Sequence, residues 1–155
     1  MGALDDRTAI VTGGSTLIGH GVVQALADAG AHVVVADLDA AGAAPFTGGS
    51  VTFRRTDVTD DDQVAALVRE TAERHGGIDV VVNLASVYLD DGPATSRADW
   101  LTALDVNVVS MVAVVRTALP WLRASRHAAV VNFGSVSSKV AQPRSEEHTS
   151  ELQSH

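Results

Sequence analysis

A glycine-rich turn near the start of the chain holds the first residues whose types and spacing could do chemistry. The turn directly follows the apolar run Thr8–Val11 and opens a helix-like segment. Glycines let the backbone approach a diphosphate closely, and a helix N-terminus favours the negative charge of that group. The sequence therefore predicts a diphosphate-binding turn made of Thr12, Gly13, Gly14, Ser15, Thr16, Leu17, Ile18 and Gly19.

An acidic residue stands at a useful distance from this turn. The second apolar run, His32–Ala36, ends in Asp37. A carboxylate about 20 positions after such a turn can accept a hydrogen bond from a ribose 2′-hydroxyl, whereas it would repel a 2′-phosphate. Ser15, Thr16 and Leu38 offer that phosphate no positive charge. We therefore expect NAD in preference to NADP, with Asp37 and Leu38 beside the adenosine ribose; the alternative for Asp37 is a strand-terminal acid that starts a turn.

Composition argues against several other classes of protein. The net charge of −8 over 155 residues opposes nucleic-acid binding, because phosphate contacts need clustered Lys and Arg, and it gives no support to binding an anionic membrane. The chain has no cysteine, and its histidines show no metal-ligand spacing, so no metal is expected. The first residues lack the pattern of a secretory signal. Because the apolar stretch Val106–Leu122 contains Asn107 and Arg116, it falls short of a membrane span, and we expect a cytoplasmic protein.

Strand-like and helix-like segments alternate along the chain. The predicted strands are Thr8–Val11, His32–Ala36, Val51–Arg55, Asp79–Val82 and Ala128–Phe133. The predicted helices are Ile18–Ala29, a helix capped by Thr59 that ends at Gly76, and a region from Ser96 to Arg123 that bends or tightens near Pro120, whereas Ala40–Gly49 is a short helix or a loop. This alternation predicts an α/β fold with a Rossmann-like, doubly wound parallel sheet. Trp100 and Trp121 are expected in core or interface packing.

The last residues, Arg144–His155, break this order. They contain one apolar residue, Leu152, and no strand pattern. They also match the translation of a common sequencing adapter along their length. We expect an incomplete dinucleotide-binding domain over residues 1–143, truncated after its fifth strand, and a non-native or disordered tail over residues 144–155.

Five segments follow one another along the chain: the Thr12–Gly19 turn, Asp57-Val58 after the third strand, Asn83-Leu84-Ala85-Ser86 after the fourth, Asn107 in the long helical region and Ser135 after the fifth strand. Together they resemble the short-chain dehydrogenase/reductase family of NAD(P)-dependent oxidoreductases. In that family the matching segments are the cofactor turn, an Asp-Val pair beside adenine, an Asn-Asn-Ala-Gly segment and two members of the catalytic tetrad. The resemblance implies strand order 3-2-1-4-5 and hydride transfer between NAD and an alcohol or carbonyl substrate in a full-length homo-oligomer.

The chain departs from the family's pattern in the cofactor turn and after the fourth strand. Leu17 takes the place of the middle glycine, where a side chain is expected to crowd the diphosphate. Leu84 and Ser86 replace the second Asn and the Gly of the Asn-Asn-Ala-Gly segment. The segment Ala85–Thr95 is expected to line part of the substrate pocket.

A third departure concerns the proton donor. In the family, Ser positions the carbonyl oxygen, Tyr is the acid/base, Lys lowers the Tyr pKa and Asn supports a proton-relay water. Ser135 and Asn107 match the first and last of these roles. No Tyr-x-x-x-Lys pair is present, because the only tyrosine, Tyr88, is followed four residues later by Gly92, and the only lysine, Lys139, comes four residues after Ser135. The chain as written is therefore expected to be inactive.

Two other classes of function stay open. A non-catalytic dinucleotide-binding domain would share the glycine turn and the acid after the second strand, and would lack the acid/base. An S-adenosylmethionine-binding, methyltransferase-like domain uses similar features, although Asp57-Val58 and Ser135 fit it less well. Purely structural roles also remain for single residues: Asp57, Asn83 and Ser135 as turn formers, and Asn107 as a satisfied core amide.

Overall fold

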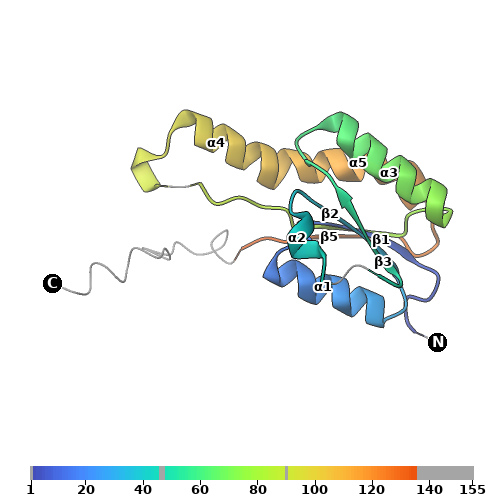
Figure 1. The fold of residues 1–155 in the computed structure, drawn as a ribbon. Coiled ribbons are helices and arrows are strands. Elements are labelled where there is room, and N and C mark those ends of the chain that lie inside the picture. Colours follow the sequence, from blue (N-terminus) through green and yellow to red (C-terminus); the bar gives the residue numbers. More distant parts are fainter. Residues whose placement is uncertain (1, 46–47, 90, 136–155) are drawn as a thin grey trace.

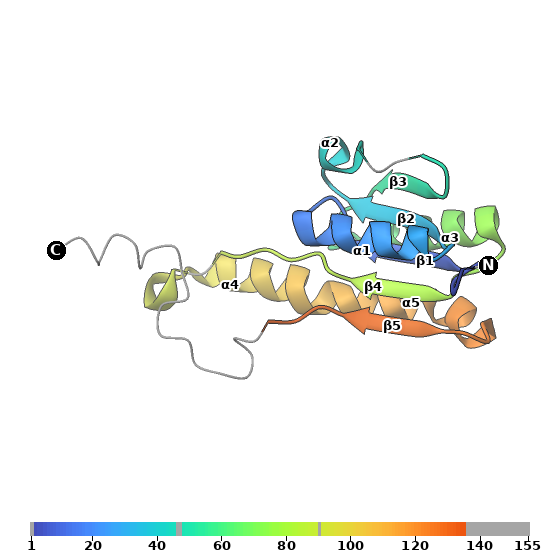
Figure 2. The ribbon, with the colours of Figure 1, turned by 90° about the horizontal axis from the view of Figure 1, so that it is seen from below.

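Five parallel strands form the centre of the structure. The computed structural model describes residues 2–45, 48–89 and 91–135; Lys139 and the tail from 144 to 155 lie outside this range. Within it, β1 (Thr8–Thr12), β2 (His32–Asp37), β3 (Val51–Arg55), β4 (Val80–Asn83) and β5 (Ala129–Asn132) pair in the order β3-β2-β1-β4-β5 (Figure 2). This confirms the predicted doubly wound order. The exposed strand β5 forms one edge of the described sheet.

Helices cover both faces of the sheet (Figure 1). Helices α1 (Leu17–Asp28) and α2 (Ala40–Ala43) lie on one face, and α3 (Asp61–His75) and α5 (Ser110–Ala124) lie on the other. Each strand alternates its side chains between the two faces, so both faces must be apolar to be buried. The run Val80–Val82 in β4 is buried throughout, as a strand covered on both faces must be.

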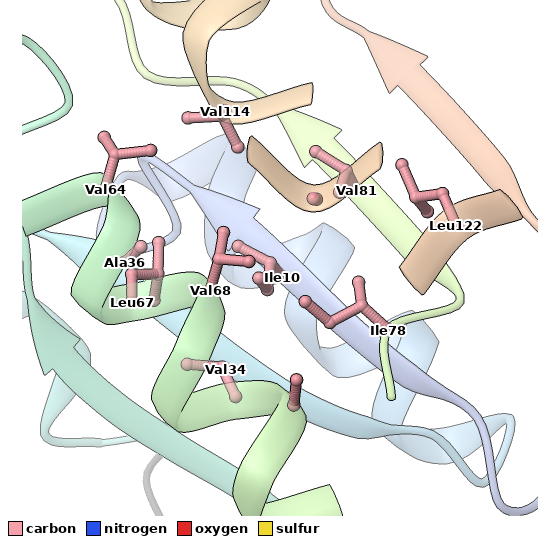
Figure 3. Packing of buried hydrophobic residues seen from close by; sticks show 12 residues of the cluster. Ile10, Val34, Ala36, Val64, Leu67, Val68, Ile78, Val81, Val114 and Leu122 are labelled. Carbon is pink, nitrogen blue, oxygen red and sulfur yellow. The ribbon is translucent and has the colours of Figure 1, made fainter. Parts of the chain in front are cut away.

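The larger core lies between the sheet and helices α3 and α5. Ile10 and Val81 from the two central strands point toward Leu67 of α3 and Val114 of α5 (Figure 3). All four side chains are completely buried. Burying apolar surface stabilises the fold by about 25 cal/mol per Å². This layer therefore holds in place the central strands that carry the site at their carboxyl ends.

The start of α3 differs from the prediction by one residue. We expected Thr59 to be the N-cap, but the carboxylate of Asp60 accepts hydrogen bonds from the backbone N–H groups of Asp62 (3.0 Å) and Gln63 (3.1 Å). An ionised acceptor at a helix N-terminus makes stronger bonds than a hydroxyl does. These bonds, the Gln63 backbone first, lower the pKa of Asp60. The predicted end is confirmed, since Gly76 caps α3 with a φ of 81°.

The long helical region is irregular at a different place from the one predicted. Helix α4 (Arg97–Leu104) continues into a π-helical turn, Asp105–Val109, and then into α5, which stays α-helical through Pro120. Pro120 has no N–H to bond the carbonyl of Arg116, yet α5 continues to Ala124. The short 3₁₀ turn Gly92–Ala94 precedes α4. Single π turns of this kind are frequent at functional sites.

The joined helix is also longer than the range Val106–Leu122. The segment Arg97–Ala124 spans 28 residues with a mean hydropathy of 1.5 in its most apolar window, and by length and composition alone it could cross a membrane. This corrects the expectation of a stretch too short and too polar, because the helix extends further toward its N-terminus. In the fold its inner face contributes Val114, Ala118 and Leu122 to the core.

Two histidines stack at the end of the sheet opposite the glycine turn. The rings of His32, at the start of β2, and His75, at the end of α3, have centroids 5.0 Å apart and an interplanar angle of 26°. Among the described residues, the Nε2 atom of His75 has no hydrogen-bond partner and is buried. Burial, followed by the proximity of His32 and Arg74, lowers the pKa of His75.

Replacing His75 should reduce the loss of stability in mild acid. Above the usual histidine pKa of about 6.5, His75 is neutral in both the folded and the unfolded chain, so its protonation does not change the free energy of unfolding. As pH falls below that value, the unfolded chain binds the proton more readily than the folded chain, and the free energy of unfolding decreases until the lowered pKa is passed. His75→Gln should therefore show a smaller drop in thermal midpoint between about pH 7.5 and about pH 5.5. His127→Gln, at an exposed histidine, is the control and should keep the wild-type drop.

Candidate functional site

The turn between β1 and α1 is held against the end of β4 by Gly13. Its φ is +68°, and a Cβ atom there would lie 2.6 Å from the N and Cα atoms of Ala85. Gly19 is equally confined, since a Cβ atom there would lie 2.5 Å from the carbonyl oxygen of Gly13. Gly14 packs on Val35 of β2. The glycines therefore let the turn, the first helix and two strands meet without intervening side chains.

The N-terminus of α1 faces solvent and has backbone N–H groups that make no hydrogen bond among the described residues. The hydroxyl of Thr16 caps the helix by accepting from Gly19 N–H (3.1 Å) while donating to the carbonyl of Gly13 (2.9 Å). In the part of the chain that the structure describes, the backbone N–H groups of Leu17 and Ile18 have no acceptor. Two free N–H groups and the positive end of the helix dipole favour an anion here.

The side chains at this helix start are apolar and point into solvent. Leu17 is 87 % exposed, and Ile18 is also exposed. A helical side chain covers the turn that precedes its own Cα. The side chain of Leu17 is thus free to lie over the diphosphate turn. That it crowds a bound diphosphate stays a prediction.

Asp37 ties the glycine turn to the end of β2. One of its carboxylate oxygens accepts from the backbone N–H of Ser15 and the other from that of Asp39, both at 3.0 Å. The Ser15 hydroxyl donates to the carbonyl of Asp39 (2.8 Å). Each carboxylate oxygen can accept a second bond, so Asp37 keeps acceptor capacity for a hydroxyl. Leu38 beside it is exposed.

The ends of β1, β4 and β5 are cross-linked by buried polar side chains. Thr12 Oγ1 accepts from the backbone N–H groups of Leu84 (3.2 Å) and Ala85 (3.3 Å). Asn83, 1 % exposed, donates from Nδ2 to Oδ1 of Asn132 on β5 (2.8 Å). Among the described residues, nothing donates to Asn83 Oδ1. Thr12 and Asn83 therefore fix the strand ends, and Asn83 leaves one buried acceptor at the carboxyl edge of the sheet.

The predicted adenine pair, Asp57-Val58, forms a tight turn before α3. Asp57 Oδ1 accepts from both the backbone N–H (3.0 Å) and the hydroxyl (2.7 Å) of Thr59. The backbone N–H of Asp57 donates to Gln63 Oε1 (2.9 Å), and Val58 is buried. Asp57 therefore acts as a turn former, which is the structural role left open for it. It lies at the same carboxyl edge of the sheet as the glycine turn.

Asn107 connects the π turn to the segment that follows β4. Its Oδ1 accepts from the backbone N–H of Val87 (2.8 Å), and its Nδ2 donates to the carbonyl of the same residue (2.9 Å). This two-point contact holds the segment against the helix as a strand neighbour would. Ser135 lies three residues after Asn132, which is level with Asn83, so the topology brings it to the same edge of the sheet.

A small pocket opens beside Asn107. It has a volume of about 220 Å³ and lies between the segment after β4 and helix α4. Tyr88 lines it, as expected for the segment Ala85–Thr95, and Asp99 and Trp100 line it from α4. Trp100, for which core or interface packing was expected, is 52 % exposed. Trp121, in contrast, packs against the larger core as predicted.

Several known proteins are similar to this chain. The profile of a family described as Enoyl-(Acyl carrier protein) reductase matches residues 14–150. A cis-4-hydroxycyclohexanecarboxylate dehydrogenase of Sinomonas cyclohexanicum is 32% identical over 154 residues, which cover 95% of this chain and 62% of the relative. An L-fucose dehydrogenase of Mus musculus is 36% identical over 144 residues, which cover 88% of this chain and 51% of the relative.

A solved structure is also similar to this chain in its fold. A crystal structure from Burkholderia xenovorans, assigned to the short-chain dehydrogenases/reductases, superposes with a TM-score of 0.84 at 30% identity and covers 90% of this chain and 60% of that one. The chain thus spans between half and two thirds of the length of these relatives.

Gly13 gives a direct test of the packing at the turn. Gly13→Ala should lower the free energy of unfolding by about 2 kcal/mol or more, because it combines a positive φ with a clash against backbone atoms. Chemical denaturation measures this change. Gly77→Ala is the matched control, since no atom lies within 4 Å of a Cβ built there, and it should cost little. Equal midpoints for the two variants would contradict the close approach of the turn to β4.

Proposed function

Because this chain belongs to the short-chain dehydrogenase/reductase family, we propose that the crevice at the carboxyl ends of β1, β2 and β4 binds NAD. We propose further that the full-length protein uses this site for hydride transfer between NAD and an alcohol or carbonyl substrate. The observation that carries the proposal is the bond between Asp37 and Ser15, because it joins the acid at the end of β2 to the glycine turn.

The residues at the crevice fit a dinucleotide. The free N–H groups of Leu17 and Ile18 suit a diphosphate, and Gly13 keeps the floor of the crevice clear where a side chain would meet Ala85. Asp37 would bond the adenosine ribose, and Asp57 and Val58 would border the adenine. When bound, NAD would accept or supply the hydride.

The preference for NAD over NADP follows from the charges around Asp37. Its carboxylate would bond a 2′-hydroxyl and repel a 2′-phosphate. The residues that its carboxylate bonds, Ser15 and Asp39, bring no positive charge, and the cation beside it in the sheet register is Arg55 of β3. An ionised acceptor contributes roughly 1.5–3 kcal/mol to such a bond.

Asp37→Asn should weaken NAD binding by about tenfold or more and narrow the preference over NADP. An Asn side chain can still accept from Ser15 N–H through its carbonyl oxygen, but its NH2 group cannot accept from Asp39 N–H, so the thermal midpoint of the variant must be compared with that of the wild type. Calorimetric titration of both dinucleotides measures the two dissociation constants. The exposed Asp28 serves as the control, because Asp28→Asn makes the same change of charge at the far end of α1. Tighter binding of NADP than of NAD by the wild-type chain would overturn the assignment.

The reacting groups in this proposal are the substrate hydroxyl or carbonyl and the residues at the mouth of the crevice. Ser135 would bind the carbonyl oxygen, and Asn107 would hold the segment after β4 that forms one wall. The names of the two relatives above specify hydroxylated ring compounds as their substrates. We propose a small alcohol or carbonyl compound for the full-length protein, without carrying over the carboxylate or the sugar that those names contain.

We also propose a cytoplasmic location and a homo-oligomer for the full-length protein. Exposed apolar side chains along the outer face of α4 and the π turn, which include Leu101, Leu104 and Val108, support the second of these, since such surface is normally covered by a partner.

The 155-residue chain itself should bind NAD without turning over alcohols. Its one tyrosine and one lysine cannot form the acid/base pair, and acid–base catalysis contributes about 10²–10⁴-fold to rate. Absorbance of NADH with a panel of secondary alcohols measures turnover, and calorimetry on the same sample verifies that NAD is bound. Turnover that Ser135→Ala abolishes would contradict this proposal.

A further inference from the structure

We propose that the pocket between the segment after β4 and helix α4 admits alcohols or ketones whose non-reacting part is apolar and uncharged, and that it rejects anionic ones. The reaction class rests on the proposed function, since that function supplies the alcohol or ketone. The charge preference rests on the pocket alone.

The wall of this pocket is mostly apolar and aromatic. Val87, Leu89, Trp100 and Ala103 line it together with the ring of Tyr88. Its volume of about 220 Å³ is below the range of about 300–1,000 Å³ that is typical for drug-sized ligands. The pocket therefore suits a single small ring or a short branched chain, held by apolar contact.

The polar atoms in the lining are largely used by the fold. Both polar atoms of the Asn107 side chain bond the backbone of Val87. Thr95 Oγ1 accepts from the backbone N–H of Asp91 (2.6 Å). A ligand rich in hydroxyl groups would lose its hydration without recovering those bonds, which favours an apolar ligand.

Asp99 gives the pocket its charge. Its Oδ2 accepts from the hydroxyl of Ser96 (2.7 Å), while Oδ1 has no partner among the described residues. No Lys, Arg or His is among the described lining residues. A carboxylate bound in so small a pocket would face Asp99 without a compensating cation, and like charges at such range oppose each other.

The chain carries its own reporter for this pocket. It has two tryptophans, so a ¹⁵N-labelled sample gives two indole N–H signals, one from Trp100 in the pocket and one from Trp121 against the core. Trp121→Phe assigns them. The signal of Trp121 then serves as an internal control for effects that do not arise in the pocket.

The experiment compares two probes that share one ring, 4-tert-butylcyclohexanol and 4-tert-butylcyclohexanecarboxylate, each titrated at neutral pH with and without NAD. We expect the alcohol to shift the Trp100 signal with at least about tenfold higher affinity than the carboxylate. Asp99→Asn should shrink that ratio severalfold, because an Asn side chain can still accept from Ser96 but carries no charge. Asp105→Asn, at an exposed acid on the same helix, should leave the ratio unchanged.

Two results would overturn the proposal: equal or tighter binding of the carboxylate by the wild-type chain, or a Trp100 signal that neither probe moves. A ratio that Asp99→Asn leaves intact would also overturn the role of Asp99. Failure of the proposed function gives a different result, since the titrations without NAD would still separate the two probes while calorimetry detected no NAD binding.

Discussion

The close approach of the β1–α1 turn to the end of β4 is the constraint on which the rest of the site depends. Gly13 can lie against the backbone of Ala85 only because it has no Cβ atom, and the preceding Thr12 bonds the same segment through its buried hydroxyl. This contact directs the start of α1, with its free N–H groups, toward the carboxyl edge of the sheet. A side chain at Gly13 would separate the helix from the strand that carries Asn83.

A second set of contacts gives the crevice its chemical character. Asp37 bonds Ser15 in the glycine turn and Asp39 after β2, so hydrogen bonds hold the acid to the turn. The N-terminus of α1, with its free backbone N–H groups, and the Asp37 carboxylate thereby lie close together. That combination suits a ligand that has both a diphosphate and a ribose hydroxyl.

The wall of the site opposite the turn is set by the π turn of the long helix. Asn107 bonds both the N–H and the carbonyl of Val87, which holds an otherwise irregular segment against α4 and encloses the small pocket beside Tyr88 and Trp100. A mid-helix Asn would ordinarily weaken a helix by competing for its backbone bonds. Here its bonds go to a neighbouring segment, so the irregular helix and the pocket wall stabilise each other.

The sequence by itself determined the order and type of the elements, the glycine turn and the acid after β2. These depend on local patterns: alternation of apolar runs and helical spacing, and glycines where the backbone must pass close to a neighbour. The capping residue of α3 and the position of the irregularity in the long helix were predicted wrongly. The first is decided by competition between neighbours, Asp60 against Thr59, and the π turn carries Asn107, whose bonds to Val87 join it to a segment far away in the sequence.

Only the tertiary structure decided which of the predicted residues share a site and what each has left to offer. It showed that the Thr12 hydroxyl and the amide nitrogen of Asn83 make hydrogen bonds between strand ends. It also showed that Asn107 bonds Val87 and that Asp99 and Trp100 border a pocket. The physical reason is that hydrogen bonds and burial join segments far apart in the chain, and no spacing within a single segment specifies which partner a polar side chain will meet.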